Sequence, residues 1–122
     1  MIDPNVVLLY VANPVVSADF YADLLGDRPL ETSPGFAMFK LQSGVRLGLW
    51  ARDRVEPTVT AAGSGCELAF AVADKDRVDE IYEDWRERGV PIAQSPTRMD
   101  FGYTFVALDP DSHRLRVFAP AA

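Results

Sequence analysis

The residues with the clearest potential for chemistry lie in the segment GVRLGLWARD, residues 44–53. Strand alternation places Gly48 and Trp50 on the same face of this segment. A glycine inside a strand often marks a point where a ligand or another backbone comes close. Trp50 therefore either stacks on a ligand beside Gly48 or belongs to a core or a dimer interface.

A second group of apolar side chains follows in TRMDFGYTFVA, residues 97–107. Met99, Phe101 and Tyr103 recur at strand parity around a glycine. Methionine and aromatic side chains form adaptable apolar walls of binding pockets. The segment SPGFAMF, residues 33–39, offers Phe36 and Met38 as its counterpart. We expect these residues to line a pocket, with an edge strand that packs on the other half of the chain as the alternative.

Few residues have the chemistry of a catalytic group. The only histidine, His113, lies in the turn sequence DPDSHR without a nucleophile or base nearby in the sequence. The single cysteine, Cys66, excludes an intrachain disulfide and gives no zinc or redox spacing. We expect His113 to be solvated and Cys66 to be buried, and we predict no catalytic residue.

Composition limits the classes of partner. The chain has 122 residues, of which 48% are hydrophobic, and a net charge of -6. These values fit one globular domain, and the lack of a basic cluster argues against nucleic acid and anionic membrane surfaces. The apolar run at the N-terminus follows an acidic residue and stops at Asn13-Pro14, so it predicts a strand instead of a signal peptide. We expect a cytoplasmic protein whose partner is a small molecule or a second copy of the chain.

An internal repeat organises the chain. LYVANPVVSADFYADLLG from Leu9 and FAVADKDRVDEIYEDWRERG from Phe70 share the order strand, cap, helix, glycine. Asn13 and Asp74 are typical helix N-caps, and Gly26 and Gly89 stand where a left-handed residue ends a helix. Apolar residues at helical spacing predict the buried faces of the two helices: Val16, Phe20 and Leu24, then Val78, Ile81 and Trp85.

Three strand-like segments follow each predicted helix, separated by turn residues such as Ser33-Pro34-Gly35 and Ser95-Pro96. Each half is therefore predicted as βαβββ. We expect module 1 over about residues 1–52, a linker over about 53–64 and module 2 over about 65–122. Because neither half is large enough to bury its helix and sheet alone, residues 1–122 are predicted to form a single domain.

This repeat, the S-x-x-FY-x-x-LLG pattern of Ser17 to Gly26 and the closing DPDSHRLRVFAP resemble the vicinal oxygen chelate superfamily, which includes glyoxalases, bleomycin resistance proteins and dioxygenases. The resemblance implies an α+β fold in which two βαβββ modules form a cupped, mostly antiparallel sheet. It also implies a ligand held inside the cup and a homodimer in which both chains border each cavity.

Enzymes of this superfamily place metal ligands at four positions, which fall here on Val6, Gly48, Glu67 and Arg116. Only Glu67 has a side chain that can bind a cation, because valine and glycine offer no donor atom and a guanidinium is always charged. The resemblance therefore predicts no metal and no cofactor. Glu67 and Arg116 are expected to form an ion pair where the metal would lie, or otherwise to contact polar groups of a ligand.

With glycine at one of these positions, we expect an empty volume beside Trp50 in which a flat ring stacks on the indole. The sequence is similar to drug-binding members of the superfamily, in particular to phenazine-antibiotic resistance proteins. It predicts a protein that sequesters a planar aromatic molecule without chemistry. The alternatives are a metal-dependent lyase, isomerase or dioxygenase, and a structural or regulatory dimer with a vestigial cavity. The predicted ligand-binding residues are Phe36, Met38, Gly48, Trp50, Glu67, Met99, Phe101, Tyr103 and Arg116.

Overall fold

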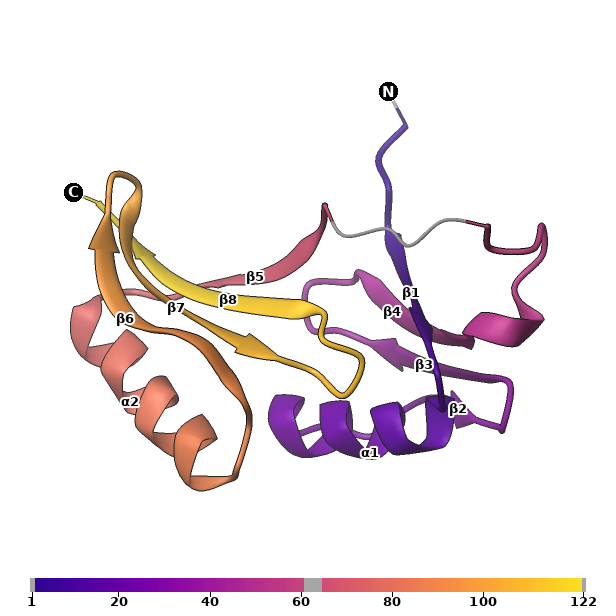
Figure 1. Cartoon of the computed structure of the whole chain (residues 1–122). Coiled ribbons are helices and arrows are strands. Elements are labelled where there is room, and N and C mark those ends of the chain that lie inside the picture. Colours follow the sequence, from indigo (N-terminus) through magenta and orange to yellow (C-terminus); the bar gives the residue numbers. More distant parts are fainter. Residues whose placement is uncertain (1, 61–64, 122) are drawn as a thin grey trace. The chain divides into compact units, whose positions relative to one another are not determined.

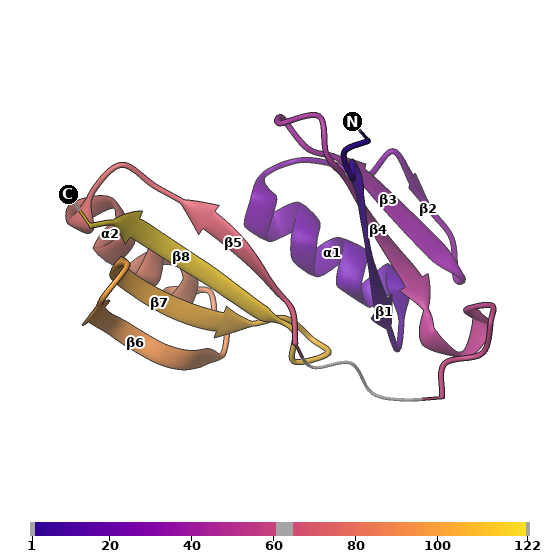
Figure 2. The same cartoon turned by 90° about the horizontal axis from the view of Figure 1, so that it is seen from above.

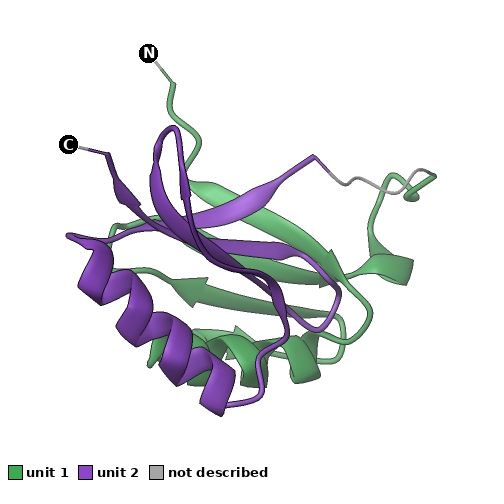
Figure 3. Ribbon diagram, turned by 60° about the vertical axis from the view of Figure 1, so that its left-hand side comes forward, with its two compact units in different colours: residues 1–62 green, residues 63–122 purple. Residues whose placement is uncertain are grey.

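The computed structural model describes residues 2–60 and 65–121 and divides into two compact units, residues 1–62 and 63–122 (Figure 3). Each unit consists of one four-stranded sheet with one α-helix. Both units have the order βαβββ, so the predicted α+β fold with a repeated module is confirmed.

Unit 1 (residues 1–62) contains one parallel and two antiparallel strand pairs. Its sheet has the order β1-β4-β3-β2, in which β1 runs parallel to β4 and the other neighbours are antiparallel (Figure 1). Helix α1 packs on β3 and β4. The elements are β1 (Val6–Val11), α1 (Pro14–Leu25), β2 (Glu31–Thr32), β3 (Phe36–Lys40), β4 (Arg46–Ala51) and the short 3-10 helix η1 (Arg52–Arg54).

Unit 2 (residues 63–122) repeats this topology, with three of its four strands longer than their counterparts. Its sheet has the order β5-β8-β7-β6, and β5 is parallel to β8 (Figure 2). Helix α2 packs on β6, β7 and β8. The elements are β5 (Glu67–Ala71), α2 (Lys75–Glu87), β6 (Ile92–Met99), β7 (Gly102–Leu108) and β8 (Arg114–Pro120).

The predicted ends of both helices are confirmed. The side chain of Asn13 accepts hydrogen bonds from the backbone N–H groups two and three residues later, at 3.0 and 3.3 Å. Asp74 accepts one from the N–H of Arg77 at 2.9 Å. Gly26 and Gly89 have φ of 71° and 81°, a left-handed conformation that few side chains tolerate.

The buried face of α1 differs from the prediction. Val16, at 51% exposure, lies on the surface, and Ser17, Ala18 and Tyr21 are buried instead. Small residues allow the helix backbone to come close to the sheet, and Tyr21 fills the remaining space. Hydrophobicity at helical spacing therefore pointed to the wrong stripe in α1, whereas Val78 and Trp85 in α2 are buried as expected.

Ser95-Pro96 was expected to form a turn, but β6 continues through both residues to Met99. Register shifts between Ile92 and Gln94 and between Gln94 and Thr97 accommodate the irregular backbone. Because β6 is an edge strand, the missing N–H of Pro96 need not break the sheet.

Each sheet buries the face that its helix covers. The core side chains alternate along the strands, as expected where one face of a sheet is covered. They include Leu9, Val11, Ala37, Phe39, Leu47 and Leu49 in unit 1 and Phe105, Ala107, Leu115, Val117 and Ala119 in unit 2. Among the described residues, no helix has the length and apolar character needed to cross a membrane.

The turn between β7 and β8 is held by a buried carboxylate. Asp109 accepts hydrogen bonds from the backbone N–H groups of Asp111 and His113 at 2.9 and 2.8 Å. Its second oxygen lies 2.8 Å from Nδ1 of His113. His113, expected to be solvated, is half-buried and has a structural contact here.

We predict that Asp109→Ala lowers the free energy of unfolding by about 1–3 kcal/mol, because the N–H groups of the turn lose a charged acceptor. Asp100→Ala, in the exposed turn between β6 and β7, is the matched control and is expected to stay within about 0.5 kcal/mol of the parent. Urea denaturation followed by circular dichroism measures both. Equal stability of the two variants would contradict the role assigned to Asp109.

Candidate functional site

The sheet of unit 1 has an apolar face on the side opposite α1. The register pairs Leu8 and Met38 with Gly48 from its two sides, and pairs Tyr10 and Phe36 with Trp50 in the same way. We call this surface the unit 1 outer face; its apolar side chains are Val6, Leu8, Tyr10, Phe36, Met38 and Trp50. The structure thus brings together four predicted site residues: Phe36, Met38, Gly48 and Trp50.

Three aromatic rings meet on the unit 1 outer face. The Trp50 ring lies 6.4 Å from that of Tyr10 and 6.5 Å from that of Phe36, with interplanar angles of 82° and 87°. Edge-to-face contacts of this kind are favourable. Tyr10 is nevertheless 38% exposed and Leu8 43% exposed within the described chain. A contiguous apolar surface that remains accessible is typical of a binding surface.

The empty volume expected beside Gly48 is not present. A Cβ atom added to Gly48 would lie 2.6 Å from Cδ2 of Leu8 and 3.1 Å from Cζ of Phe36. Neighbouring side chains on β1 and β3 therefore cover the bare backbone, and Gly48 itself is buried. The glycine permits close packing of Leu8 and Phe36, and a flat molecule would rest on their side chains instead of on the backbone.

Val6, Leu8 and Tyr10 were missed as candidate ligand contacts. The run VVLLYV is apolar at every position, so its composition hides the alternation between the two faces. Burial reveals it, because Leu9 and Val11 are buried whereas their neighbours are exposed. The available signal was strand parity, because Leu8 and Tyr10 share the parity of Val6, which the resemblance grouped with Gly48.

A charged pair lies on the sheet of unit 2, on the face opposite α2. Nε of Arg116 donates to Oε1 of Glu67 at 2.6 Å, and Nη2 lies 3.5 Å from Oε2. The side chains are 16% and 33% exposed. The expected ion pair between β5 and β8 is confirmed. We call this side of the sheet the unit 2 outer face.

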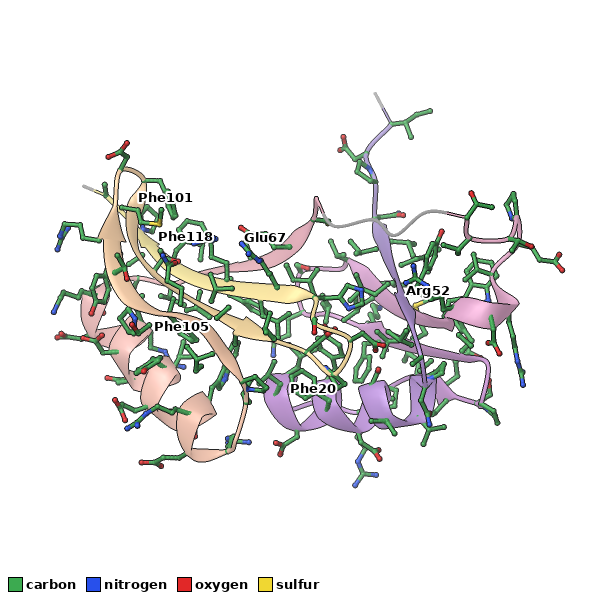
Figure 4. All side chains as sticks on the ribbon, viewed as in Figure 1. Phe20, Arg52, Glu67, Phe101, Phe105 and Phe118 are labelled. Atoms are coloured by element: carbon green, nitrogen blue, oxygen red, sulfur yellow. The ribbon has the colours of Figure 1, made fainter. Side chains whose placement is uncertain are left out.

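Two further groups fix the guanidinium of Arg116. Nη1 donates to Oγ1 of the buried Thr104 at 3.2 Å, and the carbon Cζ lies 5.5 Å from the centre of the Phe101 ring. Phe101 in turn contacts Phe118, with ring centres 6.0 Å apart. Figure 4 shows Phe101 and Phe118 on one side of the sheet and Phe105 on the side of α2. These contacts fix the guanidinium of Arg116 on the unit 2 outer face.

The structure separates Tyr103 from Met99 and Phe101. The Tyr103 hydroxyl donates to Oδ1 of Asp79 on α2 at 2.7 Å, so Tyr103 faces the helix. This hydrogen bond, followed by partial burial, raises the pKa of Tyr103 above its ordinary value. Tyr103 lies apart from Met99 because Met99 pairs with Gly102, the neighbour of Tyr103 on β7, and neighbouring residues of a strand occupy opposite faces of the sheet. Tyr103 therefore packs against α2 and does not line the unit 2 outer face.

The unit 2 outer face contains a pocket of about 330 Å³. It is lined by Ala93, Gln94, Met99, Val106, Arg114 and Arg116. Met99 and Arg116 were predicted as site residues, whereas Gln94 and Arg114 were not. Gln94 escaped notice because the sequence predicted a turn at the residues after it, and Arg114 because its charge fits an ordinary solvated turn.

The four positions that correspond to superfamily metal ligands do not fit a metal ion. Val6 and Gly48 have no donor atoms, and the Glu67 carboxylate is bound by Arg116, a cation. Across residues 2–60 and 65–121, no group of three or more histidine, cysteine, aspartate or glutamate side chains is placed to hold an ion.

Cys66, expected to be buried, is exposed just before β5.

Comparison with known proteins identifies a family and a relative of this chain. Residues 4–117 match the model of the Glyoxalase/Bleomycin resistance protein/Dioxygenase superfamily. The phenazine antibiotic resistance protein EhpR of Enterobacter agglomerans is 27% identical over 119 residues, which cover 95% of this chain and 91% of EhpR.

Two solved structures show the same fold. A protein of Agrobacterium tumefaciens, solved by solution NMR, is 51% identical with a TM-score of 0.90, and the match covers 100% of both chains. A glyoxalase/bleomycin resistance protein/dioxygenase family enzyme from Burkholderia phytofirmans is 21% identical with a TM-score of 0.81, covering 98% of this chain and 100% of that one.

We predict that Arg116→Ala lowers the free energy of unfolding by about 1–3 kcal/mol, because Glu67 and Thr104 lose a charged partner. The partial exposure of Glu67 keeps the loss below the roughly 3–5 kcal/mol typical of a deeply buried pair. Arg114→Ala, two residues away on the same strand, is expected to have little effect. A cycle with Glu67→Ala should give a coupling of at least about 0.5 kcal/mol between Glu67 and Arg116, and strict additivity would refute the pairing.

The side chains at the superfamily metal positions also lead to a prediction for the purified protein. Elemental analysis should find zinc, nickel, iron and manganese far below one equivalent per chain, because a catalytic site needs about three protein ligands. One equivalent of a divalent metal that disappears in Glu67→Ala would contradict this expectation.

Proposed function

The chain belongs to the glyoxalase/bleomycin resistance protein/dioxygenase superfamily, and we propose that within this superfamily it binds a planar aromatic small molecule and sequesters it without chemical change. The observation that carries the proposal is the accessible aromatic set of Tyr10, Phe36 and Trp50 around the covered Gly48. A flat ring can bury its apolar area on this surface, at roughly 25 cal/mol per Å².

The chemistry of the outer faces favours binding over catalysis. The superfamily metal positions hold two residues without donor atoms, one arginine, and one carboxylate that the arginine binds. Sequestration needs only affinity, so these faces can serve it with packing and a few polar contacts.

The relationship to EhpR supports the ligand class. That protein is named for resistance to phenazine antibiotics, and a phenazine is a planar tricycle of the kind that an indole can stack on. On the unit 2 outer face, we assign ligand contacts to Met99 and Phe101, with the pair of Glu67 and Arg116 as a fixed charged part of the wall. A homodimer and a cytoplasmic location remain part of the same proposal.

We predict that Trp50→Ala weakens the binding of phenazine about tenfold or more. Loss of a stacked aromatic contact removes roughly 1–1.5 kcal/mol in addition to the buried apolar area. Equilibrium dialysis with detection of phenazine absorbance measures the affinity without depending on tryptophan fluorescence.

Phe20→Ala is the matched control. Phe20 is a half-buried aromatic of α1 that contacts Tyr21, with ring centres 5.2 Å apart. Both variants should melt below the parent, but only Trp50→Ala should lose affinity. Equal losses of affinity in the two variants would show that stability, and not stacking, is the cause. Failure of the parent protein to bind phenazine, acridine or a naphthoquinone would refute the proposed function.

A further inference from the structure

The pocket of unit 2 has more positive than negative charge in its wall. Arg114 and Arg116 both line it, and Glu67 on β5 supplies a carboxylate that contacts Arg116. In the parallel register of β5 and β8, Glu67 lies opposite Arg114, yet its carboxylate binds Arg116. The pocket therefore keeps one positive charge that the pair of Glu67 and Arg116 does not neutralise.

Arg116 has little capacity left for a ligand. Its Nε and Nη2 face Glu67, its Nη1 donates to Thr104, and Phe101 covers its guanidinium plane. A guanidinium that already has a carboxylate, a hydroxyl and a ring as neighbours acts as a fixed part of the wall.

Arg114 is in the opposite situation. It is exposed, it lines the pocket, and it makes no hydrogen bond or ion pair with any side chain in residues 2–60 or 65–121. A guanidinium has five N–H donors in a planar fork that matches the two oxygens of a carboxylate. Arg114 is thus the charged group of this pocket that is available for an anion.

The remaining wall suits a flat apolar body with one polar end. The Gln94 amide faces Sδ of Met99 at 3.9 Å, and a thioether is a weak acceptor, so the amide N–H groups can turn to a better one. Val106 is buried beneath the pocket, and Met99 and Ala93 complete its apolar lining.

We propose that this pocket binds the carboxylate of a planar aromatic acid. Arg114 forms the paired hydrogen bonds to the carboxylate, Gln94 supplies a further donor, and Met99 and Val106 pack against the aromatic ring. A single spare positive charge favours a monoanion over a dianion, and the net charge of -6 on the chain acts in the same direction. This inference rests on the proposed function, because it names one chemical class, the aromatic acids, within the planar aromatic molecules proposed as ligands.

The test compares two probes of nearly equal shape, phenazine-2-carboxylate and its neutral analogue phenazine-2-carboxamide, by equilibrium dialysis at pH 7.5. The parent protein should bind the carboxylate at least about tenfold more tightly than the carboxamide, and higher salt should reduce this preference. Arg114→Gln should weaken the binding of the carboxylate at least about tenfold and bring the affinities for the two probes within about twofold of each other. Arg114→Lys, which keeps the charge but loses the fork, should retain part of the preference.

Arg98→Gln is the control for net charge, because Arg98 on β6 pairs with Tyr103 and so faces the side of α2. It should change neither affinity. Equal affinity of the parent for the two probes, or equal losses in Arg114→Gln and Arg98→Gln, would overturn the carboxylate site and leave the proposed binding of planar aromatics standing. If neither phenazine nor either derivative binds, the proposed function and this inference both fail.

Discussion

A four-stranded sheet covered by one helix can bury only one of its two faces, and both units of this protein are built in this way. Strand residues at one parity pack under α1 or α2 and form the cores. Residues at the other parity have no covering helix within their own unit, so most of them stay partly or fully exposed. The unit 1 outer face is apolar and aromatic, whereas the unit 2 outer face carries charged side chains beside a pocket. The two faces therefore differ in chemistry although they share one topology.

The ion pair of Glu67 and Arg116 determines what the unit 2 outer face can do. A carboxylate near an apolar surface needs a partner, since an unpaired charge there is costly. In this chain the partner is a guanidinium from the neighbouring strand at 2.6 Å. By binding Arg116, Glu67 is no longer available to a metal ion, and Arg114 is left without a carboxylate. A single contact thus links the poor fit to metal chemistry with the spare positive charge of the pocket.

Gly48 shows how a small residue can serve packing rather than leave a gap. The cross-strand neighbours of a glycine gain space that a Cβ would occupy, and flexible side chains move into it. Leu8 and Phe36 do so here, which brings Phe36 into edge-to-face contact with Trp50. The aromatic surface is consequently continuous over the glycine. Ligand contacts on this face are expected from side chains of three strands, and not from exposed backbone.

Local signals in the sequence were sufficient for the repeated βαβββ order, because caps and terminal glycines depend on hydrogen bonds and dihedral angles within a few residues. Asn13, Asp74, Gly26 and Gly89 all have the predicted roles. Strand parity also grouped Gly48 with Trp50, and the register of β3 and β4 adds Phe36 and Met38 to the same face.

Tertiary structure decided features that depend on neighbouring segments. These include the buried stripe of α1, the cover over Gly48 and the contact of Tyr103 with α2. The choice of Arg116 over Arg114 by Glu67 belongs to the same class, since both arginines share one parity on β8. Parity in the sequence fixes which face a side chain occupies, but only the packing of adjacent strands and helices fixes which atoms it meets there.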